Sequence, residues 1–173
     1  SALDVLEQYA PVHPNRNALR ISQDRKTEKE FLQSLGLKTA PFATVDTHED
    51  LTAAVAEIGV PSILKTRRLG YDGKGQVRLK SPDDIGPAID SVAGAACVLE
   101  GFVDFTHEVS VIGARGADGQ VACFDPGENV HRDGILHTTT LPANLSASQR
   151  MDAVLMTANI LNALEYVGVL GVE

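Results

Sequence analysis

The sequence predicts an α+β fold of two lobes, divided near Ala95. Before that point, segments with helical periodicity alternate with short strand-like segments, whereas after it several strands precede one long helix. The chain has 173 residues, of which 43% are hydrophobic, and this is enough to bury a core. We therefore expect a connector at 1–22, a smaller lobe at 23–95 and the first part of a larger lobe at 96–173.

Caps and turn residues define the elements of the smaller lobe. Asp24 is suited to be the N-cap of a helix that ends at Gly36. Thr47 and Asp50 form a capping box for a second helix, which ends at Gly59. The remaining elements expected here are strands at 42–45, 62–66 and 76–79 and a weak helix from Ser81 toward Ala93.

The larger lobe is predicted to consist mainly of strands. They are expected at 97–103, 108–114, 121–124, 135–140 and 169–173, with a hairpin turn at 115–119 and a polar loop at 125–134. Ser146 and Gln149 form a capping box for the longest helix. Since the chain begins in a connector and stops inside an apolar strand, we expect it to be part of a longer protein.

Composition and charge exclude several classes of protein. The formal net charge of −8 provides no basic field for general nucleic-acid binding. The longest apolar stretches, such as 167–172, are too short to cross a membrane, and the N-terminus lacks the pattern of a secretory signal. Cys97 and Cys123 have no metal-ligand spacing, so we expect reduced thiols in a cytoplasmic protein.

The densest glycine cluster follows the strand that contains Lys65. It contains Gly70, Tyr71, Asp72, Gly73, Lys74, Gly75 and Gln76. Glycines let backbone N–H groups approach oxyanions and lysines add positive charge, so the segment suits a flap over a phosphate chain. It lacks the Gly-Lys-Ser/Thr of a Walker A loop, and Arg78 replaces the third glycine of a Rossmann fingerprint. A hairpin loop with solvated cations is an equally good interpretation of the spacing.

Four further residues have side chains suited to binding. Glu100 ends one strand and Glu108 begins the next, where a carboxylate can accept hydrogen bonds from a sugar or an amine, or bind a cation. His131, in the expected polar loop, suits a phosphate contact. Glu173 ends the last strand and suits Mg²⁺, which takes one or two carboxylates together with substrate phosphates. A solvent-facing position is the simpler interpretation for each carboxylate taken alone.

Taken together, these segments resemble the ATP-grasp ligases, and among them the carboxyaminoimidazole ribonucleotide synthetases of purine biosynthesis. The motifs occur in family order from about Ser22 to the end of the chain: 23–25, 65–76, Glu100 with Glu108, 110–116, 129–136 and 166–173. The run from Lys65 to Gln76 is the most specific of them. The resemblance implies an ATP-grasp fold, with a flap lobe at 23–95 and the first part of the catalytic lobe at 96–173.

The resemblance also implies ATP and Mg²⁺ as cofactors and gives each candidate residue a role. Arg25 and Lys65 match cationic contacts to ATP, and Gly70 to Gln76 match the flap, with Tyr71 and Lys74 also near the ribonucleotide. Glu100, Gly101, Phe102 and Val103 match the linker along the adenine edge. Glu108 matches the carboxylate that holds the ribose, His131 a contact to the nucleotide, and Glu173 the first of two Mg²⁺ ligands.

The implied reaction uses ATP to convert bicarbonate to carboxyphosphate. That species, or CO₂ released from it, then carboxylates the amine of aminoimidazole ribonucleotide. Phosphoryl transfer requires positioned positive charge rather than a protein nucleophile, so we expect no catalytic Ser, Cys or His. The second Mg²⁺ carboxylate is expected beyond Glu173, and the chain alone is not expected to turn over. The resemblance further implies a homodimer of the full-length protein.

Two alternatives remain open at this point. One is a different ATP-grasp ligase of purine synthesis, although the residue sequence from Arg67 to Asp72 argues against it. The other is a module that binds nucleotide without catalysis.

Overall fold

The computed structural model describes residues 2–69, 75–132 and 134–173, and it divides into two compact units. The central unit is Gln23–Phe105, and the two-segment unit combines Ser1–Ser22 with Thr106–Glu173. Both units contain helices and sheet, so the α+β class is confirmed. The division falls after Phe105 and not near Ala95, because strand β4 (Cys97–Gly101) pairs with two strands of the central unit.

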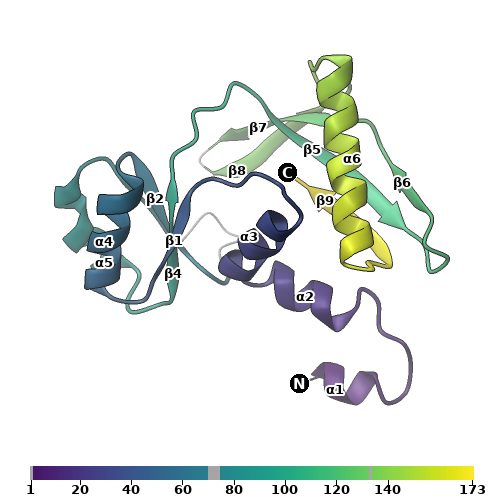
Figure 1. The fold of residues 1–173 in the computed structure, drawn as a ribbon, viewed down its shortest axis with the longest axis horizontal. Helices are drawn as coiled ribbons and strands as arrows, with labels where there is room; N and C mark the ends of the chain where they lie inside the picture. Colours follow the sequence, from purple (N-terminus) through teal and green to yellow (C-terminus); the bar gives the residue numbers. More distant parts are fainter. Residues whose placement is uncertain (1, 70–74, 133) are drawn as a thin grey trace. The chain divides into compact units, whose positions relative to one another are not determined.

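The central unit is a four-stranded antiparallel sheet with helices. Its strands lie in the order β1-β4-β2-β3, and Figure 1 shows α4 and α5 on one side of this sheet and α3 on the other. In chain order the elements other than β4 are α3 (Arg25–Ser34), β1 (Phe42–Val45), α4 (His48–Ile58), β2 (Ser62–Thr66), β3 (Gln76–Leu79), the 3₁₀-helix η1 (Pro82–Asp84) and α5 (Ile85–Ser91).

Strand alternation decides which side chains enter the core of the central unit. Val45, Leu64 and Leu99 are fully buried and pack with residues of α4 and α5. Their neighbours along each strand point to the opposite face, because successive side chains of a strand alternate. The sheet therefore has an apolar face under α4 and α5 and a second face on which polar side chains can gather.

The two-segment unit packs a long helix on a second sheet. Its elements are α1 (Ala2–Leu6), α2 (Arg16–Ser22), β5 (Glu108–Arg115), β6 (Val121–Cys123), β7 (Gly127–Arg132), β8 (Ile135–Thr140), α6 (Ala147–Ala163) and β9 (Gly168–Val172). The path β6-β5-β7-β8 is extended by β9, which pairs with β5. Helix α6 contacts β5 and β6, and Figure 1 shows it lying across β5.

The sequence-based prediction is wrong at two places in the two-segment unit. Residues 127–132, expected in a polar loop, form β7, which pairs with both β5 and β8. Residues 1–22, expected to be a connector, contain the helices α1 and α2. Asn15 anchors this segment, because its Nδ2 donates to the carbonyl oxygen of Leu164 at 2.8 Å. Across the described ranges, no helix has the length and apolar character that a membrane span needs.

Candidate nucleotide site

Lys65 and Glu100 lie on the polar face of the central sheet. In the β2–β4 pairing Ile63 is directly opposite Glu100, and Lys65 follows Ile63 by two residues on the same face. In the β1–β4 pairing Phe42 is opposite Glu100 from the other side. Glu100 is therefore flanked on both sides along the sheet, and it is only 8% exposed.

Two lysines share the buried Glu100 carboxylate. Lys65 Nζ lies 2.8 Å from Oε2, and Lys29 Nζ, from helix α3, lies 3.3 Å from Oε1. Burial alone would raise the pKa of Glu100, but the hydrogen bond and charge of Lys65 together with the charge of Lys29 outweigh it and lower that pKa. Glu100 is thus held ionised between two cations. The simpler interpretation, that it faces solvent, is wrong.

Two backbone N–H groups of the segment after Glu100 donate hydrogen bonds within the protein. The N–H of Gly101 donates to the carbonyl of Pro41 at 2.8 Å, and that of Phe102 donates to Pro61 at 3.1 Å. The Phe102 ring is covered by the guanidinium of Arg78, 4.3 Å from the ring centre. Two backbone bonds therefore tie the start of the expected adenine linker to the segments that lead into β1 and β2, the two neighbours of β4.

Helix α3 begins at Asp24, as its sequence predicts, and this residue also holds two arginines. Asp24 accepts hydrogen bonds from the backbone N–H groups of Lys26 and Thr27, as an N-cap does. Arg67 donates to both of its oxygens at 3.0 and 2.7 Å, and Arg68 Nε lies 3.4 Å from Oδ2. This link fixes the start of α3 next to the end of β2.

Arg25 is the first residue of α3 and is therefore held by the same link. Its backbone N–H donates to the carbonyl of Arg67 at 3.0 Å. No ion pair joins its guanidinium to a described residue. An adjoining cavity of about 410 Å³ is lined by Asp24, Thr66, Arg67, Arg68, Leu69, Ala95 and Ala96. Two cationic side chains, Arg67 and Arg68, thus line a cavity next to the last described residue before the glycine-rich segment.

Most of the glycine-rich segment (Gly70, Tyr71, Asp72, Gly73 and Lys74) lies outside the described residues. Its far end is fixed, because the N–H of Thr66 donates to the carbonyl of Gly75 at 2.8 Å. Gly75 has a φ of +72°, and a Cβ there would lie 2.7 Å from Thr66 Oγ1. Glycine is required at this position for both reasons. Gln76 follows and pairs with Lys65 across the β2–β3 ladder.

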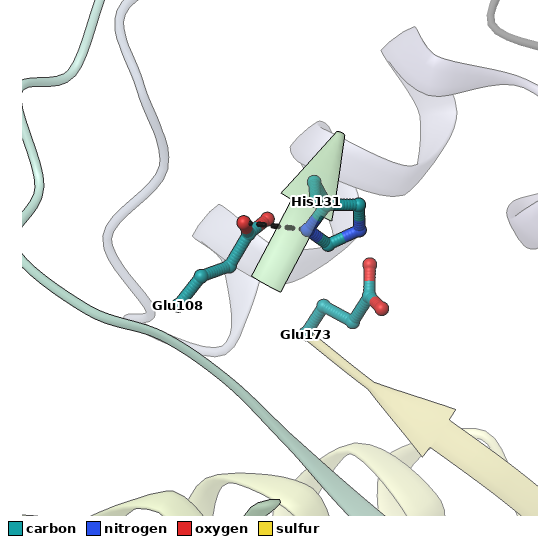
Figure 2. Close-up of side chains that lie close together, drawn as sticks. All are labelled: Glu108, His131 and Glu173. Atoms are coloured by element: carbon teal, nitrogen blue, oxygen red, sulfur yellow. Dashed lines mark ion pairs between the residues drawn. The ribbon is translucent and has the colours of Figure 1, made fainter. Parts of the chain in front are cut away.

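In the two-segment unit Glu108, His131 and Glu173 come together. Strand β5 lies between β7 and β9, so side chains from both neighbours reach Glu108 at its start. One ligand atom from each residue lies within 4.8 Å of the other two. Figure 2 shows the His131 ring between the two carboxylates. His131 therefore lies on a strand and not in the expected loop, and it still meets the other two predicted residues of this unit.

This cluster provides oxygen and nitrogen donors. His131 Nδ1 lies 2.8 Å from Glu108 Oε2, yet it is buried without a partner in hydrogen-bonding geometry. The carboxylate oxygens of Glu108 and Glu173 are ligands that Mg²⁺ prefers, whereas an imidazole is a more suitable ligand for zinc and other transition metals. The donor set at Glu173 thus fits Mg²⁺, and His131 is better suited to a hydrogen bond.

Sequence reasoning misses two features of this site. It does not single out Lys29, and it does not show that Asp24 pairs with Arg67. A lysine in a helix rich in charged residues usually faces solvent, but the Lys29 side chain is only 14% exposed. The pairing of Asp24 with Arg67 joins residues 43 positions apart, so no local spacing indicates it. The sequence signal that could have pointed to these contacts is the concentration of positively charged residues at 65–68.

Comparison with known proteins agrees with this geometry. The chain is 53% identical, over its whole length, to the N5-carboxyaminoimidazole ribonucleotide synthase of Brucella melitensis, of which it covers 48%. It thus spans about half the length of the curated relatives it matches. A crystal structure titled as the ADP complex of PurK, N5-carboxyaminoimidazole ribonucleotide synthetase, superposes with a TM-score of 0.92 at 38% identity, covering 98% of this chain and 45% of that one.

A second solved structure extends the comparison to another ligand. The Aspergillus clavatus N5-carboxyaminoimidazole synthase, in complex with ADP and 5-aminoimidazole ribonucleotide, has a TM-score of 0.89 at 25% identity. The match covers 98% of this chain and 44% of that one. The ATP-grasp domain itself matches residues 30–173, which is most of the sequence. The expected fold is therefore confirmed, and the chain belongs to the ATP-grasp family.

Proposed function

We propose that the full-length protein containing this chain carboxylates aminoimidazole ribonucleotide with ATP and bicarbonate. The products are N5-carboxyaminoimidazole ribonucleotide, ADP and phosphate, formed by way of carboxyphosphate. One observation carries the proposal: similarity over the whole of this chain to proteins named N5-carboxyaminoimidazole ribonucleotide synthase. The same resemblance supports a cytoplasmic homodimer, which sedimentation of the full-length protein would test.

In the central unit we assign ATP contacts to cations and backbone groups. Arg25 and Lys65 supply positive charge to the phosphates, where it offsets the charge that develops during phosphoryl transfer. The segment from Gly70 to Gln76 is assigned to the phosphates as well, on sequence resemblance alone for Gly70–Lys74. Glu100 to Val103 are assigned to the adenine. Since the Gly101 and Phe102 N–H groups already have acceptors, Val103 is the residue whose N–H we assign to the base.

In the two-segment unit we assign Glu108 to the ribose hydroxyls, His131 to the nucleotide and Glu173 to Mg²⁺. The carboxylate of Glu108 can accept two hydrogen bonds from vicinal hydroxyls. When bound, Mg²⁺ would supply charge neutralisation at the phosphates. None of these assignments requires a protein nucleophile, because the reaction passes its phosphoryl group from ATP to bicarbonate.

A product assay on the full-length protein tests the proposal. With ATP, Mg²⁺ and ¹⁴C-bicarbonate, we expect ADP formation that depends on aminoimidazole ribonucleotide, with label in the ribonucleotide product. ADP formation that depends on glycinamide ribonucleotide or formate instead would assign a different ligase of the pathway. Saturable ATP binding without turnover on any of these substrates would indicate a non-catalytic nucleotide-binding module. The isolated chain is expected to give no turnover.

A further inference from the structure

Lys29 lies beside Lys65 and Glu100, two of the proposed ATP contacts, but the proposed function assigns no role to it. It lies in the middle of α3, and its ammonium reaches the Glu100 oxygen that Lys65 does not use. The exposed fractions of the side chains are 14% for Lys29, 21% for Lys65 and 10% for Glu100. Two ammonium groups therefore share one carboxylate in a place that water reaches poorly.

The fold holds Lys29 in this position from two sides. Its ammonium lies 5.7 Å from the centre of the Phe42 ring, within the range of a cation–π contact. Phe42 is the residue directly opposite Glu100 on β1, so both contacts of Lys29 lie on one edge of the same sheet face. Helix α3 in turn is fixed at its start by Asp24. The Phe42 ring and the fixed start of α3 thus hold the Lys29 side chain toward Glu100.

Two cations pair with the one carboxylate of Glu100. Glu28 is the next carboxylate on α3, and burial raises its pKa despite the nearby charges of Arg25 and Lys29. No ion pair links Glu28 to a described lysine or arginine. Among the described ion pairs at Glu100, two ammonium groups therefore meet a single carboxylate. Such a pair of cations is stabilised when an anion binds next to it.

The arrangement decides what happens when Lys65 turns to a phosphate. If Lys65 were the only partner of Glu100, its departure would leave a buried carboxylate without a counter-ion, which is strongly unfavourable. Lys29 would remove this penalty, because it lies 3.3 Å from Oε1, the oxygen that Lys65 does not use. Lys29 acts through Glu100 and need not touch the nucleotide.

We propose that Lys29 is a positioning residue for the nucleotide: it keeps Glu100 paired and so releases the Lys65 ammonium to bind a nucleotide phosphate. This inference rests on the proposed contact between Lys65 and ATP. It predicts that the importance of Lys29 depends on the negative charge of Glu100 and on the presence of phosphates in the ligand.

The test is a double-mutant cycle on the full-length protein, with Mg·ATP and adenosine titrated calorimetrically. Lys29→Met is expected to weaken Mg·ATP binding about tenfold, and adenosine binding by less than about twofold. In a Glu100→Gln background the same substitution is expected to have an effect below about twofold. Lys29→Arg should restore most of the affinity. Lys26→Met, which removes a half-buried α3 lysine paired with Glu30 at 3.7 Å, is the matched control.

The other outcomes overturn this proposal, the proposed function on which it rests, or both. An equal loss for ATP and adenosine would show a structural role, and circular dichroism melts of each variant would reveal misfolding directly. A full loss that persists in Glu100→Gln would mean that Lys29 acts on the phosphates itself. Wild-type protein that does not bind Mg·ATP would overturn both this inference and the proposed function. Wild-type protein that binds ATP but does not carboxylate aminoimidazole ribonucleotide would overturn the proposed function alone.

Discussion

Arg67 donates two hydrogen bonds to the carboxylate of Asp24, from Nε to Oδ1 at 3.0 Å and from Nη2 to Oδ2 at 2.7 Å. The pair joins the end of β2 to the N-cap of α3, and the Asp24 side chain is only 6% exposed. A bidentate pair of this kind combines charge with fixed geometry. It therefore determines where α3 begins relative to the central sheet, and with it the positions of Arg25 and Lys29.

Replacing Asp24 is expected to destabilise the central unit. Asp24→Ala removes the N-cap and leaves the partly buried Arg67 without its partner, so we expect a loss of about 3 kcal/mol in the free energy of unfolding. Asp24→Asn keeps a cap and should lose less. Urea titration followed by circular dichroism measures both, with the exposed Asp83→Asn as control. Equal stability of Asp24→Ala and the control would contradict the structural role given to the pair.

The same carboxylate predicts a pH dependence. Burial acts to raise the pKa of Asp24, but the hydrogen bonds from Arg67 and from the Thr27 backbone outweigh it and lower that pKa below its ordinary value of 3.8. The unfolded chain then binds the proton more readily than the folded one. The stabilisation is complete above the ordinary pKa and is lost as the pH falls through the lower folded value.

Wild-type protein should therefore lose stability on acidification below about pH 4 more steeply than Asp24→Asn, in which this group no longer titrates. Unfolding midpoints in urea at a series of pH values between about 6 and 3 would show the difference. Parallel curves for the two proteins would mean that Asp24 has no lowered pKa in the folded state.

Gly113 is expected to tolerate no side chain. A Cβ at this position of β5 would lie 2.8 Å from Leu161 Cδ1 and 2.8 Å from Thr157 Cγ2, both on α6. Gly113→Ala should therefore destabilise the two-segment unit by about 1–3 kcal/mol through overpacking. Gly86→Ala is the matched control, because nothing lies within 4 Å of its Cβ position. Thermal unfolding of both variants measures the contrast, which would vanish if α6 packed elsewhere.

Asn15 is expected to be needed for the attachment of the N-terminal segment. Its Nδ2 donates to the carbonyls of Leu164 and Glu165, and its Oδ1 accepts from the N–H of Ala18 at 2.8 Å. Asn15→Ala should cost about 1–2 kcal/mol and make residues 1–22 more sensitive to protease. Asn17→Ala loses a side chain that accepts a hydrogen bond from the exposed Arg20, and this variant should digest as the wild type does. Equal digestion of the two variants would refute the anchor.

Glu173 is expected to affect the requirement for metal. In the full-length protein Glu173→Gln should raise the Mg²⁺ concentration for half-maximal ADP formation by about tenfold, because a charged oxygen ligand becomes neutral. The exposed Asp152→Asn provides the control. Steady-state rates over a Mg²⁺ series at fixed ATP measure the effect. An unchanged Mg²⁺ dependence, whatever the maximal rate, would remove Glu173 from the proposed metal site.

Local signals in the sequence predicted most elements. The capping boxes at Thr47 and Ser146 are both present, and β1, β2 and β3 have the predicted bounds. Strand β7 was not predictable in this way, because Glu128, Asn129, His131 and Arg132 hide any alternation of apolar residues. It forms because β5 and β8 provide partners on both sides, and pairing of this kind is a long-range property.

The candidate site was also predictable only in part from the sequence. Resemblance brought Lys65, Glu100, Glu108, His131 and Glu173 to attention, and the structure places the first two together and the last three together. The burial of Glu100 and its second lysine were not accessible to sequence reasoning. They depend on strand register and on the direction of α3, and a carboxylate at a strand end is exposed in most proteins.

The attachment of residues 1–22 to the far end of the sequence has a consequence for folding. The central unit is one continuous segment, so every contact within it is available once residue 105 has left the ribosome. The two-segment unit can close only after Leu164 and Glu165 have been synthesised, because these residues bind Asn15. Contacts of such long sequence separation form slowly. During synthesis the central unit is therefore expected to fold first. Residues 1–22 are expected to dock only later, once Leu164 and Glu165 are available to bind Asn15.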